Sequence, residues 1–159
     1  MSAKKIYWYI FAAQRGLYFF IYSVLLYCIF KYTNELMKEK LVLEYSINSS
    51  PKVLYARLST PGGLSEWFAD DVNVKGDTYS FFWEGNEQKA EAVLKKENRY
   101  IRFRWKEDPE AFFEFRINVD ELTKDVALVI TDLIDEDDVD GAKELWDSQV
   151  SELKHVLGL

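Results

Sequence analysis

Residues 71–134 contain a series of short segments in which apolar and polar residues alternate. Turn-forming residues separate these segments, which cover residues 71–74, 78–84, 88–95, 99–106, 111–120 and 125–134. Alternation with a period of two is typical of strands that bury one face, and short strands joined by tight turns indicate one antiparallel meander. Residues 125–134 are the most apolar segment, so we predict that this strand lies at the centre of the sheet.

Apolar side chains occupy one parity of these strands and charged side chains the other. The residues expected on the inner face are Tyr79, Phe81, Trp83, Ala90, Ala92, Leu94, Ile101, Phe103, Trp105, Phe113, Phe115, Ile117 and Val119. The opposite parity carries Arg102, Arg104, Glu114 and Arg116, which can form cross-strand ion pairs. We predict that these four residues lie on a solvated outer face. Turned inward, Arg104 or Arg116 would instead bind a ligand carboxylate.

One strand and a short helix are predicted before the meander. Residues 41–47 alternate, and their inner face carries Leu41, Leu43, Tyr45 and Ile47. Ser50 suits the cap of a helix and Pro51 its first turn, and this helix is expected to run to about Leu58. The side chains expected to point inward from it are Val53, Leu54 and Leu58.

Two further helices complete the expected architecture. Thr60 and Pro61 begin a short helical segment whose apolar side carries Leu64, Trp67 and Phe68. A long helix is expected over about residues 139–157, with a stripe formed by Ala142, Trp146, Gln149, Val150, Leu153 and Leu157. The predicted fold class is therefore α+β, with a curved antiparallel sheet of about seven strands, two short helices after the first strand, a long C-terminal helix and a separate hydrophobic N-terminal helix.

The beginning of the chain is strongly hydrophobic. Residues 6–30 are apolar apart from Gln14 and Arg15, with smaller breaks at a glycine and a serine. The uninterrupted part, residues 16–30, is shorter than the roughly 20 residues that a membrane helix needs. The longer span would place Arg15 inside the hydrocarbon, which is costly. This segment is open to three interpretations: a leader outside the functional fold, a membrane anchor, or an exported or surface-lying helix.

These observations predict two parts of unequal role. The first is a hydrophobic leader, residues 1–36, and the second is a folded domain, residues 37–159, which begins at Met37 directly before the first strand. We expect the domain to be cytoplasmic, or alternatively to be held at a membrane through residues 6–30. A membrane contact is expected only through that segment.

Charge and the scarcity of metal-binding residues exclude several classes of function. The net charge is −7, and the acidic excess lies after residue 36, so the domain repels phosphate backbones and nucleic acid is not an expected partner. Cys28 and His155 are single residues of their type, so neither a Cys/His zinc site nor an intrachain disulfide can form. We predict no cofactor.

Residues 135–141 form an acidic run ending in glycine, and Asp147 follows at the spacing of a calcium-binding loop. However, Glu136 stands where the loop usually has its first Asp, and Asp147 stands where it usually has a bidentate Glu. Acidic residues at a helix start are already favoured by the helix dipole. No metal site is therefore predicted.

No motif predicts catalytic residues. Asp70 and Asp71 are adjacent, so on a strand their carboxylates point in opposite directions and cannot easily share one substrate atom. His155 has no nucleophile placed beside it, and Ser65 lacks the context of a nucleophile elbow. A non-enzymatic role is favoured.

The strongest candidate site is a pocket lined by aromatic residues. Its expected lining is Trp67, Phe68, Phe81, Trp83, Phe103, Trp105, Phe113, Phe115, Trp146 and Val150. Ligand cavities are concave and mostly apolar, which this set would supply. The same residues could equally form an ordinary filled core, because aromatic side chains dominate packing.

The order of elements, together with three local motifs, resembles the START-like (birch-pollen-allergen-like, SRPBCC) superfamily. The motifs are Ser50-Pro51 before the first helix, Leu58-Ser59-Thr60-Pro61 leading to Leu64-x-x-Trp67, and the closing helix that carries Trp146. Over about residues 37–159 the chain looks most like small bacterial relatives of the activator of the heat-shock chaperone ATPase.

The resemblance implies a helix-grip fold, in which the sheet wraps the C-terminal helix and a hydrophobic cavity lies between them. It implies binding of a hydrophobic small molecule or lipid. The alternative is a co-chaperone-like domain that docks a protein partner through its acidic surface and the Trp67-Phe68 corner. A cyclase- or hydrolase-like enzyme on the same fold is the third possibility, since fold alone does not fix function.

Overall fold

The computed structural model describes residues 38–135 and 138–159, and Lys38–Leu159 form one compact unit. The predicted leader, residues 1–36, and the membrane anchor proposed for residues 6–30 lie outside the described residues. Within the described part of the chain, no helix combines the length and the apolar character needed to cross a membrane.

The order of elements agrees with the prediction from the sequence. The elements are β1 (Lys38–Ser46), α2 (Pro51–Ser59), α3 (Pro61–Ser65), β2 (Asp71–Lys75), β3 (Thr78–Trp83), β4 (Asn86–Lys96), β5 (Tyr100–Trp105), β6 (Phe112–Val119), β7 (Val126–Asp135) and α4 (Val139–Val156). The fold is thus the expected α+β helix-grip architecture, a curved sheet of seven strands with a C-terminal helix and two short helices.

All strands pair antiparallel in the order β1-β7-β6-β5-β4-β3-β2. Strands β2 to β7 form the predicted meander, and β1 returns to pair with β7. The prediction that residues 125–134 form the central strand is wrong, because β7 is the second strand from the β1 edge and β5 occupies the centre. Apolar composition identified β7 as an interior strand, but strand order depends on where β1 adds to the sheet.

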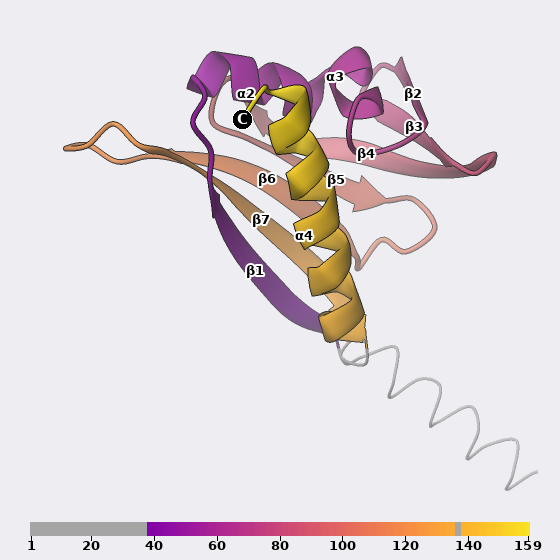
Figure 1. The fold of residues 1–159 in the computed structure, drawn as a ribbon. Helices are drawn as coiled ribbons and strands as arrows, with labels where there is room; N and C mark the ends of the chain where they lie inside the picture. The colour runs from indigo at the N-terminus through magenta and orange to yellow at the C-terminus, as the bar shows by residue number, and fades with distance from the viewer. Residues whose placement is uncertain (1–37, 136–137) are drawn as a thin grey trace, which may run out of the picture. The chain divides into compact units, whose positions relative to one another are not determined.

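The three helices lie on one face of the sheet, as Figure 1 shows. The long helix α4, drawn in yellow, crosses this inner face and contacts β1 and β7. Helix α2 contacts β5 and β6, and α3 contacts β2. The side of the sheet away from the helices is called the outer face below.

Local hydrogen bonds and close packing explain the paired short helices. Ser50 Oγ accepts from the N–H of Val53 and Thr60 Oγ1 accepts from the N–H of Gly63, so both helix starts are capped. A Cβ on Gly63 would lie 2.3 Å from the carbonyl oxygen of Ala56, so only glycine lets α3 approach α2 this closely.

Val53 does not point inward as predicted. Its side chain is 49% exposed, whereas Leu54 and Leu58 are fully buried. The latter two lie one turn apart on the helix and face the sheet together, and Val53 falls outside that narrow stripe.

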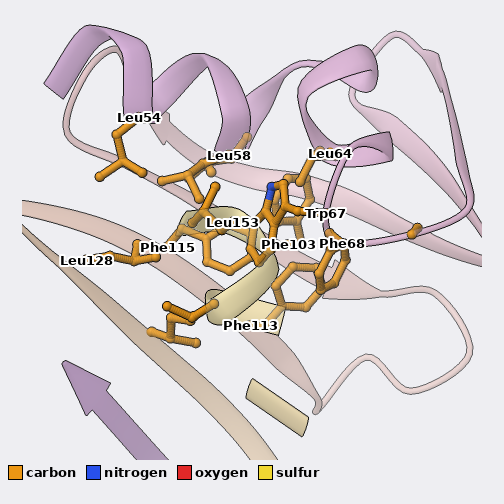
Figure 2. Packing of buried hydrophobic residues seen from close by; sticks show 14 of the residues in the cluster. Leu54, Leu58, Leu64, Trp67, Phe68, Phe103, Phe113, Phe115, Leu128 and Leu153 are labelled. Atoms are coloured by element: carbon orange, nitrogen blue, oxygen red, sulfur yellow. The ribbon is translucent and has the colours of Figure 1, made fainter. Parts of the chain in front are cut away.

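The core is built largely from aromatic rings and leucines (Figure 2). Phe103 and Phe113 stack with ring centroids 4.9 Å apart, and Phe68 meets Phe81 edge to face at 5.2 Å. These are the separations that aromatic pairs prefer. Leu58 from α2 and Leu153 from α4 are fully buried in the same cluster, so helices and sheet share one core.

Leu94 also departs from its expected position. Ala92 pairs with Phe103, but Leu94 pairs with Arg102, so the register shifts by one residue between them. This β-bulge reverses the parity of the strand and turns Leu94 outward, where it is 48% exposed. Strict alternation in the sequence cannot reveal such an inserted residue.

Candidate functional site

A cavity of about 390 Å³ lies between α4 and the sheet. Its lining comes from five strands, α4 and the loop after α3, and comprises Phe68, Trp83, Gln88, Trp105, Phe113, Asp132, Ala142, Leu145, Trp146 and Gln149. The four α4 residues follow the spacing i, i+3, i+4, i+7, which brings them onto one face of the helix. Alternation along the strands brings the sheet residues to the inner face opposite them.

Aromatic rings form most of the walls of this cavity. The Trp146 ring stacks on Phe68 with centroids 5.8 Å apart and an interplanar angle of 12°. Trp105 lies 5.0 Å from Phe113 and 6.4 Å from Trp83. The indole N–H of Trp83 donates to the carbonyl oxygen of Phe68 at 2.8 Å, which fixes that ring.

The ten residues predicted to line a pocket divide into two groups. Phe68, Trp83, Trp105, Phe113 and Trp146 line the cavity. The other five, Trp67, Phe81, Phe103, Phe115 and Val150, are buried in the core and are not among its lining residues. The first five residues therefore fit the interpretation as a pocket, and the other five fit the interpretation as a filled core.

Asp132 brings a carboxyl group to the cavity. The indole N–H of Trp146 donates to its Oδ2 at 2.8 Å, which joins α4 to β7. Burial raises the pKa of Asp132, while the hydrogen bonds from Trp146 and the Leu133 backbone and the charge of Lys38 act in the opposite direction. The sequence analysis missed this residue, although its parity with Ile130 places it on the inner face.

Gln149 is the second polar group that was missed. It belongs to the predicted stripe of the last helix but was counted only as part of an apolar face. Its Nε2 donates to the Phe68 carbonyl oxygen at 3.4 Å. Its Oε1 is buried and has no hydrogen-bond partner among the described residues. Such an atom costs free energy unless something else binds it.

A second cavity, of about 420 Å³, adjoins the first and shares Trp105, Asp132, Ala142 and Leu145 with it. Lys38 is among its lining residues and bridges Asp108 at 2.6 Å and Asp135 at 2.9 Å. The hydrogen bond to Asp108 is the largest cause of a raised pKa at Lys38. Asp132 therefore stands where the two cavities meet.

A larger hollow, of about 1090 Å³, lies beside the β6–β7 hairpin and is mainly polar. It is lined by Asp120 among others, whose carboxylate accepts from the backbone N–H groups of Leu122 and Thr123. None of its lining residues in the described part of the chain is aromatic, and the Asp120 carboxylate is engaged in its own turn. The α4 cavity is the better candidate on chemical grounds.

The charged residues of the outer face form a compact ion-pair group. Glu114 accepts from Arg102 at 2.9 Å and from Arg116 at 2.8 Å, and the guanidinium groups lie over the rings of Phe112 and Tyr100. The predicted cross-strand pairing is present, but Glu114 is only 3% exposed rather than solvated. The neighbouring arginines cover it.

The remaining sequence candidates have local roles or are exposed. Asp70 Oδ2 accepts from the backbone N–H of Glu84, and the Ser65 hydroxyl donates to the carbonyl oxygen of Pro61. Arg104 and His155 are exposed. In the described ranges, no three Asp, Glu, His or Cys side chains gather closely enough to hold a metal ion.

The family follows from comparison with known proteins. A sequence profile of the START-like superfamily domain matches residues 36–159. The chain belongs to the START-like superfamily. The resemblance inferred from the sequence motifs is thereby confirmed. No curated protein matches the chain significantly.

Solved structures agree with this assignment. BfR322 from Bacteroides fragilis is 41% identical, with a TM-score of 0.57 over 77% of this chain and 93% of its own. The Aha1 dimer from Colwellia psychrerythraea is 17% identical, with a TM-score of 0.64 over 73% of this chain and 93% of its own. DynU16, from the dynemicin biosynthetic locus, is 16% identical, with a TM-score of 0.65 over 75% of this chain and 47% of its own. The last two likenesses show the fold alone.

Proposed function

We propose that this START-like domain binds a small hydrophobic molecule in the cavity between α4 and the sheet. The observation that carries the proposal is the 390 Å³ space with aromatic walls and a few polar atoms, at the place where helix and sheet separate. Ligand pockets typically occupy roughly 300–1,000 Å³ and have this mixture of apolar walls and few polar groups. The volume favours a compact ligand over a long lipid.

Binding is favoured over catalysis by the polar groups present. Asp132 is the titratable carboxyl of the 390 Å³ cavity, and its other polar lining residues, Gln88 and Gln149, carry amides that do not titrate. General acid–base chemistry usually needs a second titratable group within hydrogen-bond reach of the substrate. The lining therefore supports a binding site more than a cyclase- or hydrolase-like site.

The alternative role, a domain that docks a protein partner, would need a different surface from the one predicted. Trp67 and Phe68 are 6% and 5% exposed, so the corner they form is part of the core and is not an exposed docking surface.

Native mass spectrometry of the full-length protein, purified from its own host, tests the proposal. We expect a small molecule to remain bound, and we expect it to be absent from the Ala142→Leu variant, whose larger side chain enters the cavity. A mass without ligand for the wild-type protein, together with no binding of added aromatic compounds, would overturn the proposal. In that case a pull-down for a protein partner would be the next experiment.

The domain boundary is a separate proposal. Lys38–Leu159 form one compact unit. A chain that starts at Met37 should therefore unfold cooperatively in urea and remain monodisperse without detergent. Such a domain would be cytoplasmic. If the shortened chain aggregates while the full-length chain stays folded, residues 1–36 are needed for folding and the boundary is wrong.

A further inference from the structure

Asp132 and Gln149 bring acceptor oxygens to the cavity, and the third polar residue of the lining, Gln88, is exposed to solvent. Gln149 directs its Nε2 to the Phe68 carbonyl oxygen, and the reverse orientation would set two oxygens against each other. Its free polar atom is therefore Oε1. Asp132 accepts hydrogen bonds from Trp146 and from the Leu133 backbone, and an ionised carboxylate has room for about two more.

We infer that the ligand of this cavity is a protonated amine attached to an apolar body. This inference rests on the proposed function and specifies the chemical class of the ligand. An ammonium group has three N–H donors, so it can bind both Asp132 and Gln149 Oε1, whereas its apolar part contacts the aromatic walls.

The aromatic walls favour a cation for an independent reason. Trp83, Trp105 and Trp146 all line the cavity, and indole rings are the strongest cation–π partners among side chains. A cation bound beside Asp132 would therefore have indole rings as well as a carboxylate among its neighbours.

Among the described residues, Asp132 also has no salt-bridge partner of its own. The Lys38 ammonium, whose charge acts on Asp132, is paired with Asp108 and Asp135. The pKa of Asp132 is raised because the effect of burial exceeds the opposite effects of the Trp146 and Leu133 hydrogen bonds and the Lys38 charge. A ligand cation would supply the missing countercharge.

Other ligand chemistries fit less well. A carboxylate would be repelled by Asp132, and a hydrocarbon would leave both acceptors unpaired. An alcohol has a single donor and could bind only one of the two acceptors. The order of affinity expected for one skeleton is therefore amine, alcohol, hydrocarbon and carboxylate.

The test is a titration of the full-length protein with four compounds that share one skeleton. These are 3-phenylpropylamine, 3-phenylpropan-1-ol, propylbenzene and 3-phenylpropanoate, with binding followed through the indole N–H resonances of the tryptophans. We expect the amine to bind about tenfold or more tightly than the alcohol, which is the usual effect of hydrogen bonds to a charged group.

Two charge-neutralising variants separate a local contact from general attraction to an acidic domain. Asp132→Asn keeps an oxygen that accepts from Trp146 but removes the charge, and it should abolish the preference for the amine while binding of the alcohol is retained. Glu144→Gln removes the same charge from an exposed position of α4 outside the cavity lining, and it should leave the preference unchanged.

The outcomes distinguish this inference from the proposed function. If none of the four compounds binds, the proposed function itself fails. If the alcohol, hydrocarbon or carboxylate binds as tightly as the amine, or if both variants lose the preference equally, the cavity binds ligands but the amine inference is wrong. If Asp132→Asn fails to fold, Gln149→Met supplies the test, because it removes the second acceptor and should weaken amine binding selectively.

Discussion

The two halves of α4 face different surroundings. The C-terminal half places Val150 and Leu153 in a closed core, where both are essentially inaccessible to water. The N-terminal half places Ala142 and Leu145 over a cavity, and Gln149, just past the midpoint of the helix, completes the helix side of its lining. Trp146, near the middle of the helix, belongs to both environments, because its ring packs with Phe68 and Phe115 of the core and also lines the cavity.

The side chains of the two halves explain why a cavity lies under one part of a continuous helix. In the closed half, branched aliphatic side chains meet the aromatic rings of the sheet directly. Over the cavity, the helix stripe carries a small alanine in the N-terminal half and a polar glutamine just past the midpoint, and Asp132 of β7 lines the same space. Side-chain size and polarity at single positions, rather than helix geometry, set the packing.

Trp146→Ala should have the largest effect, because it removes the residue that belongs to both halves. The loss of its buried ring should destabilise the domain by about 3–5 kcal/mol. Urea unfolding measures this change, with Leu145→Ala as the control: its side chain is 59% exposed, so its loss should cost less than about 1 kcal/mol. Similar losses for the two variants would show that Trp146 does not anchor the helix.

Leu153→Ala tests the closed half alone. Its side chain is fully buried, so the substitution should cost about 2–4 kcal/mol of unfolding free energy, through lost contacts and a new cavity. Ligand affinity should remain unchanged, because Leu153 is not part of the cavity lining. A combined loss of stability and affinity would show that the two halves are coupled.

Ala142→Leu tests the open half by adding side-chain volume rather than removing it. The added side chain enters existing space, so the free energy of unfolding should change by less than about 1 kcal/mol, while ligand binding is lost. Titration with 3-phenylpropylamine and urea unfolding together measure both effects. Strong destabilisation would mean that the space beneath Ala142 is already closed to a larger side chain.

Asp132→Asn should change the free energy of unfolding least, and the size of this change should depend on pH. Burial raises the pKa of Asp132 in the folded state, so wild-type stability from this group is fully present below the ordinary carboxyl pKa and is lost as the pH rises through the raised value. The stability of the variant relative to wild type should therefore increase from acid to neutral pH.

Asp120→Asn should show the opposite dependence of stability on pH. Backbone N–H groups of Thr123 and Leu122 lower the pKa of Asp120, so its stabilising contribution is present at neutral pH and is lost in acid. The stability of this variant relative to wild type should decrease as the pH rises. Equal pH profiles for the two variants would contradict both assignments.

Most of the fold could be predicted from the sequence because strand parity and helix capping are local properties. The alternation around Phe103 and Phe113 identified the inner face, and Ser50 and Thr60 identified two helix starts. Strand order and the bulge before Leu94 could not be predicted in this way, because both depend on pairing between distant segments.

The candidate site could be predicted only in part. Strand parity identified Trp83, Trp105 and Phe113 of the cavity lining, and the helical patterns identified Phe68 and Trp146, but the division between cavity and filled core depends on how α4 packs against the sheet. Asp132 could have been found, since it continues the inner parity of β7 after Ile130. The free oxygen of Gln149 could not, because its orientation is fixed by the carbonyl group of Phe68.

The ion pairs of Glu114 on the outer face have a consequence for how the chain folds. A slip of β6 by one residue against its neighbours would turn Phe113 and Phe115 to water and bring Glu114 and Arg116 among aromatic rings. In the native alignment the Glu114 carboxylate pairs with Arg102 across the strands as well as with Arg116 on its own strand, whereas in the slipped alignment it would lose Arg102, and both Glu114 and Arg116 would be buried among the rings. The charged pairs therefore disfavour misaligned hairpins during folding and help to select a single arrangement of the sheet.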